Sequence, residues 1–325
     1  MTTYKEIFGK YVKNYSSDPS SDIEGQVWYN STTGVFKTNL AGAAAWAAGG
    51  NMGTARRTPA GAGTQTVGLA FGGNTGSISA ATEEYDGSAW TTGGTMSTAR
   101  YVLGGCGTQT AGLAFGGYST TTIANTEEYD GSAWTGGGNL GTARFGMGSA
   151  GIQTAGLAFG GRVDPPGISQ NATEEYDGSA WTGGGNLNTT RAYLAGCGIQ
   201  TAGLAIGGYT GTANTGATEE YDGSAWTAGG SLATARRYLA GAGTQTAGLG
   251  SGGYATTAAG STATEEYNGS SWSNSTNLST ARYGLGGAGT QTAGLSFGGI
   301  SSGTYLTSTE EYTDPVFTTK TITTS

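Results

Sequence analysis

The sequence predicts an all-β fold, a β-propeller of six four-stranded blades, because one unit is copied six times along almost the whole chain. In each copy a tryptophan precedes a run of small residues and then an arginine. The tryptophans recur at intervals of 44 to 47 residues, at Trp46, Trp90, Trp134, Trp181, Trp226 and Trp272. Each copy also has a Gly-Gly pair and a Glu-Glu-Tyr string, which ends at Tyr85, Tyr129, Tyr176, Tyr221, Tyr267 or Tyr312. Short apolar runs and glycine turns at such a period are typical of propeller blades.

The copy that begins after Arg100 shows the first two strands of a blade. Residues 101–107 are mostly small, as the crowded position next to a propeller axis requires. Residues 108–110 predict a polar turn, and residues 111–115 are apolar, which favours a strand buried on both faces. They end at a glycine pair, 116–117, where positive φ permits a sharp exit from the strand.

The third and fourth strands of this copy follow a variable stretch. Residues 126–129 form the third strand, Asp130-Gly131 predicts a hairpin turn, and the outer strand begins near Trp134. Alternation puts Glu127 and Tyr129 on one face of the strand and the intervening glutamate on the other. The aromatic rings can then pack between sheets, where a buried Trp contributes about 4–6 kcal/mol from about 150–250 Å² of buried area.

One arginine ends the motif of every copy, and a buried guanidinium requires a carboxylate partner. We therefore expect each to pair, within or between blades, with a motif glutamate. The alternative, a ring of catalytic carboxylates, is disfavoured because these groups occur equally in all copies, whereas chemistry is asymmetric. The motif arginines are Arg56, Arg100, Arg144, Arg191, Arg236 and Arg282.

The two ends of the chain compete to close the ring. The sixth copy has no tryptophan after Tyr312, whereas Trp46 lacks the strands that should precede it. We expect the strand around residues 43–48 to complete the last blade, with residues 317–323 as the alternative. The expected domains are an N-terminal leader, 1–40, and a propeller, 41–325.

The leader lies outside the repeat. We expect a short helix at 4–12, a polar linker at 14–21 and a hairpin of residues 25–30 and 35–37. Because an isolated hairpin is marginally stable, the leader should dock on the propeller, another copy or a partner, unless it is a frayed tail. Trp28 and Tyr29 are its candidate anchor residues.

Composition excludes several classes of function. The formal net charge is -8 and all lysines lie outside the repeats, which argues against nucleic acid as a partner. No apolar run reaches the ~20 residues of a membrane helix, and no signal peptide is visible. Cys106 and Cys197 occupy a repeat position that is alanine elsewhere, so we expect buried, unpaired thiols. No acid/base pair or metal cluster stands apart from the repeat, so we expect no enzyme and no cofactor.

The order of landmarks resembles a kelch repeat. Phe115-Gly116-Gly117, Tyr129-Asp130, Trp134, Leu140 and Arg144 match in one copy, and the match extends over residues 46–312. The resemblance implies a kelch-like propeller but says little about function. The copper site of one kelch-like oxidase class is not implied, because the chain has no histidine.

A narrower resemblance is to virion proteins of tailed bacteriophages, especially marine phages of cyanobacteria. It rests on the leader segments at 18–20, 24–30 and 34–37 and on the Thr-Glu-Glu-Tyr-Asp-Gly-Ser-Ala-Trp repeats, which are similar to kelch-like appendage proteins. The resemblance implies a tail- or neck-associated protein whose leader binds other virion proteins and whose propeller serves attachment or decoration. It also implies several copies on the particle and a virion location.

Recognition, if present, should lie on the face formed by the second-to-third and fourth-to-first connections, where the copies differ. Drift in unconstrained loops is the alternative. A carbohydrate-binding propeller is the second function and a sialidase-type hydrolase the third, disfavoured because the Asp-to-Trp spacing is too short for an aspartate box. The candidate recognition residues are Tyr118, Arg162, Asp164, Tyr209, Tyr254 and Tyr305.

Overall fold

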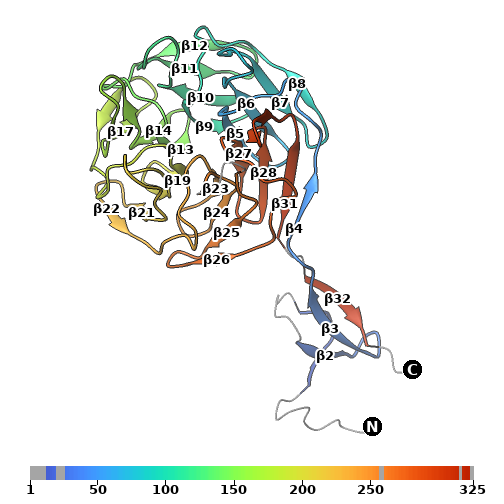
Figure 1. Cartoon of the computed structure of the whole chain (residues 1–325). Coiled ribbons are helices and arrows are strands. Elements are labelled where there is room, and N and C mark those ends of the chain that lie inside the picture. Colours follow the sequence, from blue (N-terminus) through green and yellow to red (C-terminus); the bar gives the residue numbers. More distant parts are fainter. Residues whose placement is uncertain (1–11, 20–25, 256–259, 315–316, 323–325) are drawn as a thin grey trace. The chain divides into compact units, whose positions relative to one another are not determined.

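A computed structural model describes residues 12–19, 26–255, 260–314 and 317–322. All regular elements of these residues are β-strands. The chain divides into two compact units, one of residues 1–45 and 314–325 and the other of residues 46–313. The larger unit is a β-propeller (Figure 1). The helix expected at 4–12 lies outside the described residues, apart from Val12.

The propeller consists of six antiparallel four-stranded sheets, each a blade numbered along the chain. Blade 1 contains β5 (Ala60–Gly63), β6 (Gly68–Phe71), β7 (Thr82–Tyr85) and β8 (Trp90–Thr92). Blade 2 contains β9 (Gly104–Thr108), β10 (Ala111–Phe115), β11 (Thr126–Tyr129) and β12 (Trp134–Gly137). Blade 3 contains β13 (Gly148–Ile152), β14 (Ala155–Phe159), β17 (Thr173–Tyr176) and β18 (Trp181–Gly183).

The other three blades repeat the same order. Blade 4 contains β19 (Ala195–Ile199), β20 (Ala202–Ile206), β21 (Thr218–Tyr221) and β22 (Trp226–Ala228). Blade 5 contains β23 (Ala240–Gly243), β24 (Gly248–Ser251), β25 (Thr264–Tyr267) and β26 (Trp272–Asn274). Blade 6 contains β27 (Gly286–Gly289), β28 (Ala293–Phe297), β31 (Thr309–Thr313) and β4 (Ala45–Ala48). Two short ribbons lie in second-to-third loops, β15 (Arg162–Val163) with β16 (Ile168–Ser169) and β29 (Ile300–Ser301) with β30 (Thr304–Tyr305).

The first strand of every blade lies next to the axis, and each contacts the first strands of both neighbours around the full ring (Figure 1). The second residue of this strand must be small, and it is glycine in five blades and Ser149 in blade 3. A Cβ on Gly61 would lie 2.4 Å from the carbonyl oxygen of Gly287, and one on Gly196 would lie 2.4 Å from that of Ser149. The small residues expected in the first strand are therefore required by the approach of neighbouring backbones. Cys106 and Cys197, also in first strands, are buried and unpaired as expected, and burial raises the pKa of both thiols to about 12.

The ring closes through the N-terminal strand. β4, which carries Trp46, is the outer strand of blade 6 beside β31. Just after β4, the amide of Gly49 donates to the carbonyl of Thr309 at 3.0 Å. The Trp46 Nε1 donates to Thr264 Oγ1 of blade 5 at 3.0 Å. Strand 45–48 thus fills the position for which the sequence offered two candidates.

The other candidate strand, β32 (Phe317–Thr321), belongs to the smaller unit. That unit is one sheet in the order β1 (Lys13–Tyr15), β2 (Val27–Asn30), β3 (Val35–Ala41), β32. The expected propeller span of 41–325 is therefore wrong at both ends. Backbone pairing explains the correction, since β3 needs a partner on its free edge and β32 pairs with it along five residues. β1 also replaces part of the linker expected at 14–21.

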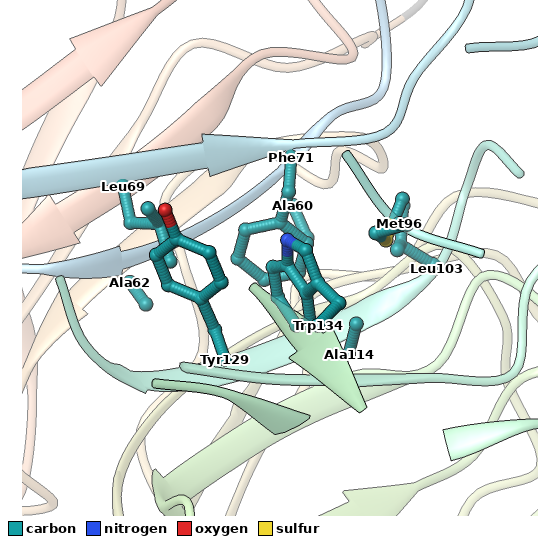
Figure 2. Packing of buried hydrophobic residues seen from close by; sticks show 9 residues of the cluster. All are labelled: Ala60, Ala62, Leu69, Phe71, Met96, Leu103, Ala114, Tyr129 and Trp134. Atoms are coloured by element: carbon teal, nitrogen blue, oxygen red, sulfur yellow. The ribbon is translucent and has the colours of Figure 1, made fainter. Parts of the chain in front are cut away.

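Each interface between blades contains an apolar cluster, as shown for blades 1 and 2 in Figure 2. Trp134 of blade 2 lies against Phe71 of blade 1, with ring centroids 5.0 Å apart, and against Tyr129 at 4.9 Å. Its Nε1 donates to Thr82 Oγ1 at 2.9 Å, so the indole is both buried and hydrogen-bonded. The same Trp-to-Thr bond crosses every interface of the ring.

The second glutamate of the Glu-Glu-Tyr string binds the next blade. Tyr129 Oη donates to Glu84 of blade 1 at 2.5 Å, whereas Glu128 accepts from Tyr176 of blade 3 at 2.6 Å. Strand alternation causes this division, because residues 128 and 129 point to opposite neighbours. Six such Tyr–Glu bonds encircle the propeller, including the one from Tyr85 to Glu311 between the last and first blades.

A glutamine in the first turn of each blade also crosses the interface. Gln109 Nε2 donates to the carbonyls of Gly68 and Tyr85, at 3.0 and 2.8 Å. The equivalent residues make the same pair of contacts around the ring. The sequence identified these residues only as parts of polar turns, so their role in joining blades was missed.

The Tyr–Glu network predicts a loss of stability at high pH. Burial first, and the glutamate second, raises the pKa of Tyr129 from 10.0 to about 12. Tyr85, Tyr176, Tyr221 and Tyr267 are shifted likewise. The unfolded chain ionises first, so this contribution is complete below pH 10 and is lost as the pH rises from 10 to 12. Urea unfolding should show this decline, and it should be shallower for Tyr129→Phe.

The variant Glu84→Gln serves as the control for this prediction. It keeps the buried phenol but replaces the carboxylate that accepts its hydrogen bond with an uncharged amide. Tyr129 should therefore ionise at a lower pH than in the wild type but above 10.0. Absorbance of tyrosinate follows the titration directly. A wild-type protein equally stable at pH 9 and pH 12 would contradict the expectation.

Two adjacent glycines of β12 predict opposite effects of alanine. A Cβ on Gly137 would lie 2.5 Å from Tyr176 Oη, whereas a Cβ on Gly136 meets nothing within 4 Å. We expect Gly137→Ala to break the Tyr176–Glu128 bond and to lower the free energy of unfolding by about 1–3 kcal/mol. Gly136→Ala should be neutral or stabilise by up to about 1 kcal/mol. Urea unfolding of both variants tests the pair, and equal losses would contradict the prediction.

Candidate functional site

The motif arginines hold the variable loops at their base. Arg144 is fully buried, and its Nη2 lies 3.1 Å from Glu174 Oε1. Its Nη1 donates to the carbonyls of Gly160 and Ala172, at 2.8 and 2.6 Å, where the second-to-third loop begins and ends. The expected pairing is confirmed in every blade and lies within the blade. The pairs are Arg56–Glu83, Arg100–Glu127, Arg144–Glu174, Arg191–Glu219, Arg236–Glu265 and Arg282–Glu310.

These contacts engage all the motif carboxylates. The first glutamate of each string pairs with arginine and the second accepts from tyrosine of the next blade. Desolvation lowers the pKa of the arginines, and the paired glutamate opposes that shift and so favours the charged guanidinium in the interior. The repeated acidic groups therefore have a structural role, as their equal occurrence in the copies indicated.

The second-to-third and fourth-to-first connections meet at one end of the strands, as expected. The residue after each motif arginine pairs with the residue after the Gly-Gly of the same blade, for example Tyr101 with Tyr118 and Arg237 with Tyr254. We call this surface the loop face. Outside the buried motif arginines, its connections contain three arginines and one acid, Asp164. At the opposite ends of the strands lie the exposed Asp-Gly turns.

A ring of backbone hydrogen bonds surrounds the axis at the loop face. The second residue after each motif arginine donates its N–H to the equivalent carbonyl of the preceding blade, at 2.6 to 3.2 Å. All six residues have φ between 48° and 63°, a region that disfavours residues with a Cβ. Strain of this kind persists where the surrounding structure imposes it. The ring consists of Thr58, Val102, Gly146, Tyr193, Tyr238 and Gly284.

A cavity of about 220 Å³ opens at this ring, and we call it the aromatic bowl. Aromatic rings from four consecutive blades, 3 to 6, follow one another around part of the axis. Centroids lie 6.0 Å apart between Phe145 and Tyr193, 4.4 Å between Tyr193 and Tyr238, and 6.4 Å between Tyr238 and Tyr283. All these tyrosines are half-buried. The bowl is lined by Arg57, Thr58, Tyr101, Val102, Phe145, Tyr193, Tyr238, Tyr283, Gly284 and Ile300.

Two arginines at the bowl stack on aromatic rings. Arg57 lines the bowl, whereas Arg237 lies just outside the lining, 5.8 Å from the ring centroid of Tyr238. The Arg237 guanidinium lies 4.5 Å from the ring centroid of Tyr209 and 4.9 Å from that of Tyr254. Arg57 lies 5.4 Å from the ring of Tyr305. Within the part of the chain that the structure describes, no carboxylate lies within 4.0 Å of either guanidinium. Stacking thus holds these cations without neutralising them.

The structure brings most of the expected recognition residues to this region. Tyr118 lies between Tyr101 and Phe145, with ring centroids 5.7 and 5.6 Å away. Tyr209, Tyr254 and Tyr305 support the two stacked arginines. The first residue of β15, Arg162, is half-buried on the same face but does not line the bowl.

Asp164 has a different position from the other expected residues. It is exposed in the loop between β15 and β16, and its backbone carbonyl accepts a hydrogen bond from Thr122 Oγ1 at 3.0 Å. This bond joins the loops of blades 2 and 3. The side chain does not line the bowl, although burial and, to a lesser extent, the charge of Asp164 raise the pKa of Tyr193.

Sequence reasoning missed the centre of the site. Tyr193, Tyr238 and Tyr283 were not singled out, and no role was predicted for Arg57 or Arg237. The signal was present: the two positions after each motif arginine vary strongly between copies whose flanking residues hardly change. Only the ring geometry shows that these positions converge.

The candidate anchor residues belong to the smaller unit. Trp28 is fully buried there, and its Nε1 donates to Asp18 Oδ1 at 3.3 Å. Asp18 also accepts from Asn30 Nδ2 at 2.7 Å and pairs with Lys37 at 2.7 Å. The Trp28 ring thus packs inside the unit, and its role as an anchor residue stays a prediction. Tyr29 is half-buried against Phe36, with ring centroids 5.2 Å apart.

Comparison with protein-family models and with curated proteins found no match to this chain. Among the described residues, no helix has the length and apolar character needed to span a bilayer. In the same residues, no group of three or more His, Cys, Asp or Glu side chains is arranged to hold a metal ion. The fold and the loop face thus define a β-propeller with an aromatic, arginine-bordered bowl.

Proposed function

We propose that the protein is a non-enzymatic structural component of a bacteriophage virion, and that its propeller recognises the host surface. The virion part of the proposal rests on the resemblance of the leader and repeats to tail- and neck-associated phage proteins. In the proposal the smaller unit attaches the chain to other virion proteins, and several copies decorate each particle.

One observation carries the recognition part of the proposal. The six copies are nearly uniform wherever side chains join blades, and they differ at the loop face, where aromatic and cationic residues gather around the bowl. In five blades the motif arginine bonds to a carbonyl at each end of its loop, and in blade 5 Arg236 bonds to the carbonyl at the loop's end, so the varied residues are presented on a rigid base. Varied side chains on a rigid scaffold are the usual arrangement of a binding surface.

Labelling of particles tests the virion location. An antibody raised against the full chain, with a gold-conjugated second antibody, should label purified particles of the encoding virus in electron micrographs. The free protein, added in excess to host cells, should also reduce particle adsorption. Detection of the chain in infected cells without label on intact particles would contradict the proposal.

A carbohydrate-binding propeller of cellular origin is the second candidate. The half-buried tyrosines around the bowl favour it, because rings with one exposed face and a polar tip suit sugars. Glycan binding by a chain that never occurs in particles would support this function and exclude the first.

A further inference from the structure

We propose that the aromatic bowl binds an acidic saccharide, a pyranose that carries a carboxylate or a sulfate group. The proposal rests on the recognition role proposed above and gives it a ligand class. In this arrangement the sugar ring lies against the tyrosines of the bowl, and Arg57 and Arg237 bind its anionic group.

The size and lining of the bowl suit a single sugar ring. Its volume of about 220 Å³ is below the ~300–1,000 Å³ typical of pockets for drug-sized ligands. Tyr193, Tyr238 and Tyr283, from three consecutive blades, line part of it, and each is half-buried and in contact with a neighbouring ring. Such tyrosines offer apolar faces to the C–H groups of a pyranose and hydroxyls to its oxygens, with little loss of conformational entropy.

The charges select an anionic ligand. Arg237 is sandwiched between Tyr209 and Tyr254, and Arg57 lies over Tyr305. The Nε atoms of both arginines are buried and have no hydrogen-bond partner in the described residues. A guanidinium held by stacking keeps donors that bind a carboxylate or sulfate in bidentate fashion.

Both arginines lie in the neighbourhood of Tyr238. Arg57 and Tyr238 both line the bowl, and the Arg237 guanidinium lies 5.8 Å from the ring centroid of Tyr238. Burial raises the pKa of Tyr238, and both cations oppose that rise. Two cations in the neighbourhood of one tyrosine are unfavourable without a counter-ion. Asp164, the only acid of the loop-face connections, forms no ion pair with either arginine in the described residues. An anionic ligand supplies the missing charge in a chain whose formal net charge is -8.

The variants follow substitutions that the repeat already contains. Arg57→Ala and Arg237→Ala reproduce Ala192, which occupies the same repeat position in blade 4. The control is Asp130→Asn, on the opposite side of the propeller, where Asn268 makes the same turn contacts in blade 5. The control and each arginine variant alter the charge by one unit but in opposite senses, so an effect of overall charge is distinguished from an effect of the bowl.

Titration calorimetry of the full chain tests the proposal with galacturonate, sulfated galactan and neutral galactan oligosaccharides of equal length. At least one acidic oligosaccharide should bind at least tenfold more tightly than the neutral one. Arg57→Ala and Arg237→Ala should each weaken that binding at least tenfold, with unchanged circular dichroism, and Asp130→Asn should alter it less than twofold. Binding should also weaken as salt is added.

Four results would overturn the proposal: no binding of either acidic oligosaccharide, equal binding of the neutral one, arginine variants that bind as the wild type does, or a glutamate hexapeptide that binds as tightly as the sugar. The last would indicate an acidic peptide ligand. Particle labelling and inhibition of adsorption are independent of these titrations. If both succeed while no acidic saccharide binds, the ligand class fails and the proposed function stands.

Discussion

Arg144→Met is expected to lower the free energy of unfolding by about 3–5 kcal/mol, the cost of leaving one member of a buried ion pair without its partner. Arg144 is fully buried, and Glu174 beside it is nearly so. Methionine fills much of the same space, so the loss reports on the missing charge and hydrogen bonds. Urea unfolding with a common m-value measures it.

Two further variants separate the causes of this loss. Arg144→Met combined with Glu174→Met should recover part of the stability, because no uncompensated charge remains. Recovery should be incomplete, since the carbonyls of Gly160 and Ala172 still lack their donor. The control Arg162→Met, at a half-buried arginine without an ion pair in the described residues, should change stability by no more than about 0.5 kcal/mol. A loss below 1 kcal/mol for Arg144→Met would contradict a structural role of the pair.

Trp134→Ala is expected to cost about 3–5 kcal/mol, as truncation of a buried aromatic residue usually does. The indole packs against Phe71 and Tyr129 (Figure 2). It is 7% exposed and donates a hydrogen bond to Thr82 that the variant lacks. The loss concerns two blades together, because the ring lies at their interface. Urea unfolding should therefore show one cooperative transition at lower denaturant.

Trp46→Ala is the matched comparison and should cost less than Trp134→Ala. Trp46 is half-buried, and Ser251 stands at the repeat position that Phe71 occupies at the interface of blades 1 and 2. Its indole packs against Tyr312, with centroids 5.1 Å apart. Equal losses in the two variants would show that the interface aromatic residues do not determine the energy of blade packing.

The fold could be predicted from the sequence because the residues that determine it recur in every copy of the repeat. The strands at 111–115 and 126–129 were predicted with the boundaries that the structure has. The period of two along a strand also predicted that Glu127 and Tyr129 share a face, and the structure adds what each one contacts. Uniformity across copies identified the arginine–glutamate pairs as structural, since a charge buried six times needs six partners.

The sequence predicted that a strand exists more readily than it predicted which strand it pairs with. Residues 317–323 have strand composition, which indicates a strand but does not select between the edge of blade 6 and the edge of β3. The hydrogen-bonding requirement of β3 in the smaller unit decides this. For the same reason Gln109 was identified as part of a turn, because a side chain that bonds two carbonyls of another blade leaves no local signal.

The candidate site was only half predicted. The residues after each Gly-Gly were identified because their loops vary in length. Tyr193 and Tyr238 follow a motif arginine within two residues, where substitution looks like ordinary divergence between copies. Both residues have a left-handed backbone, as do all six residues of the hydrogen-bonded ring, and this conformation turns their positions toward the axis. Tyrosine rarely adopts it, so the sequence gives no signal that the ring forms.

An experimental structure of the full chain at side-chain resolution tests the central claim most directly. It should show a closed ring of six four-stranded sheets, with strand 45–48 beside strand 309–313 and the Trp46 indole bonded to Thr264. A ring with another number of sheets, or one closed by residues 317–321, would contradict the account.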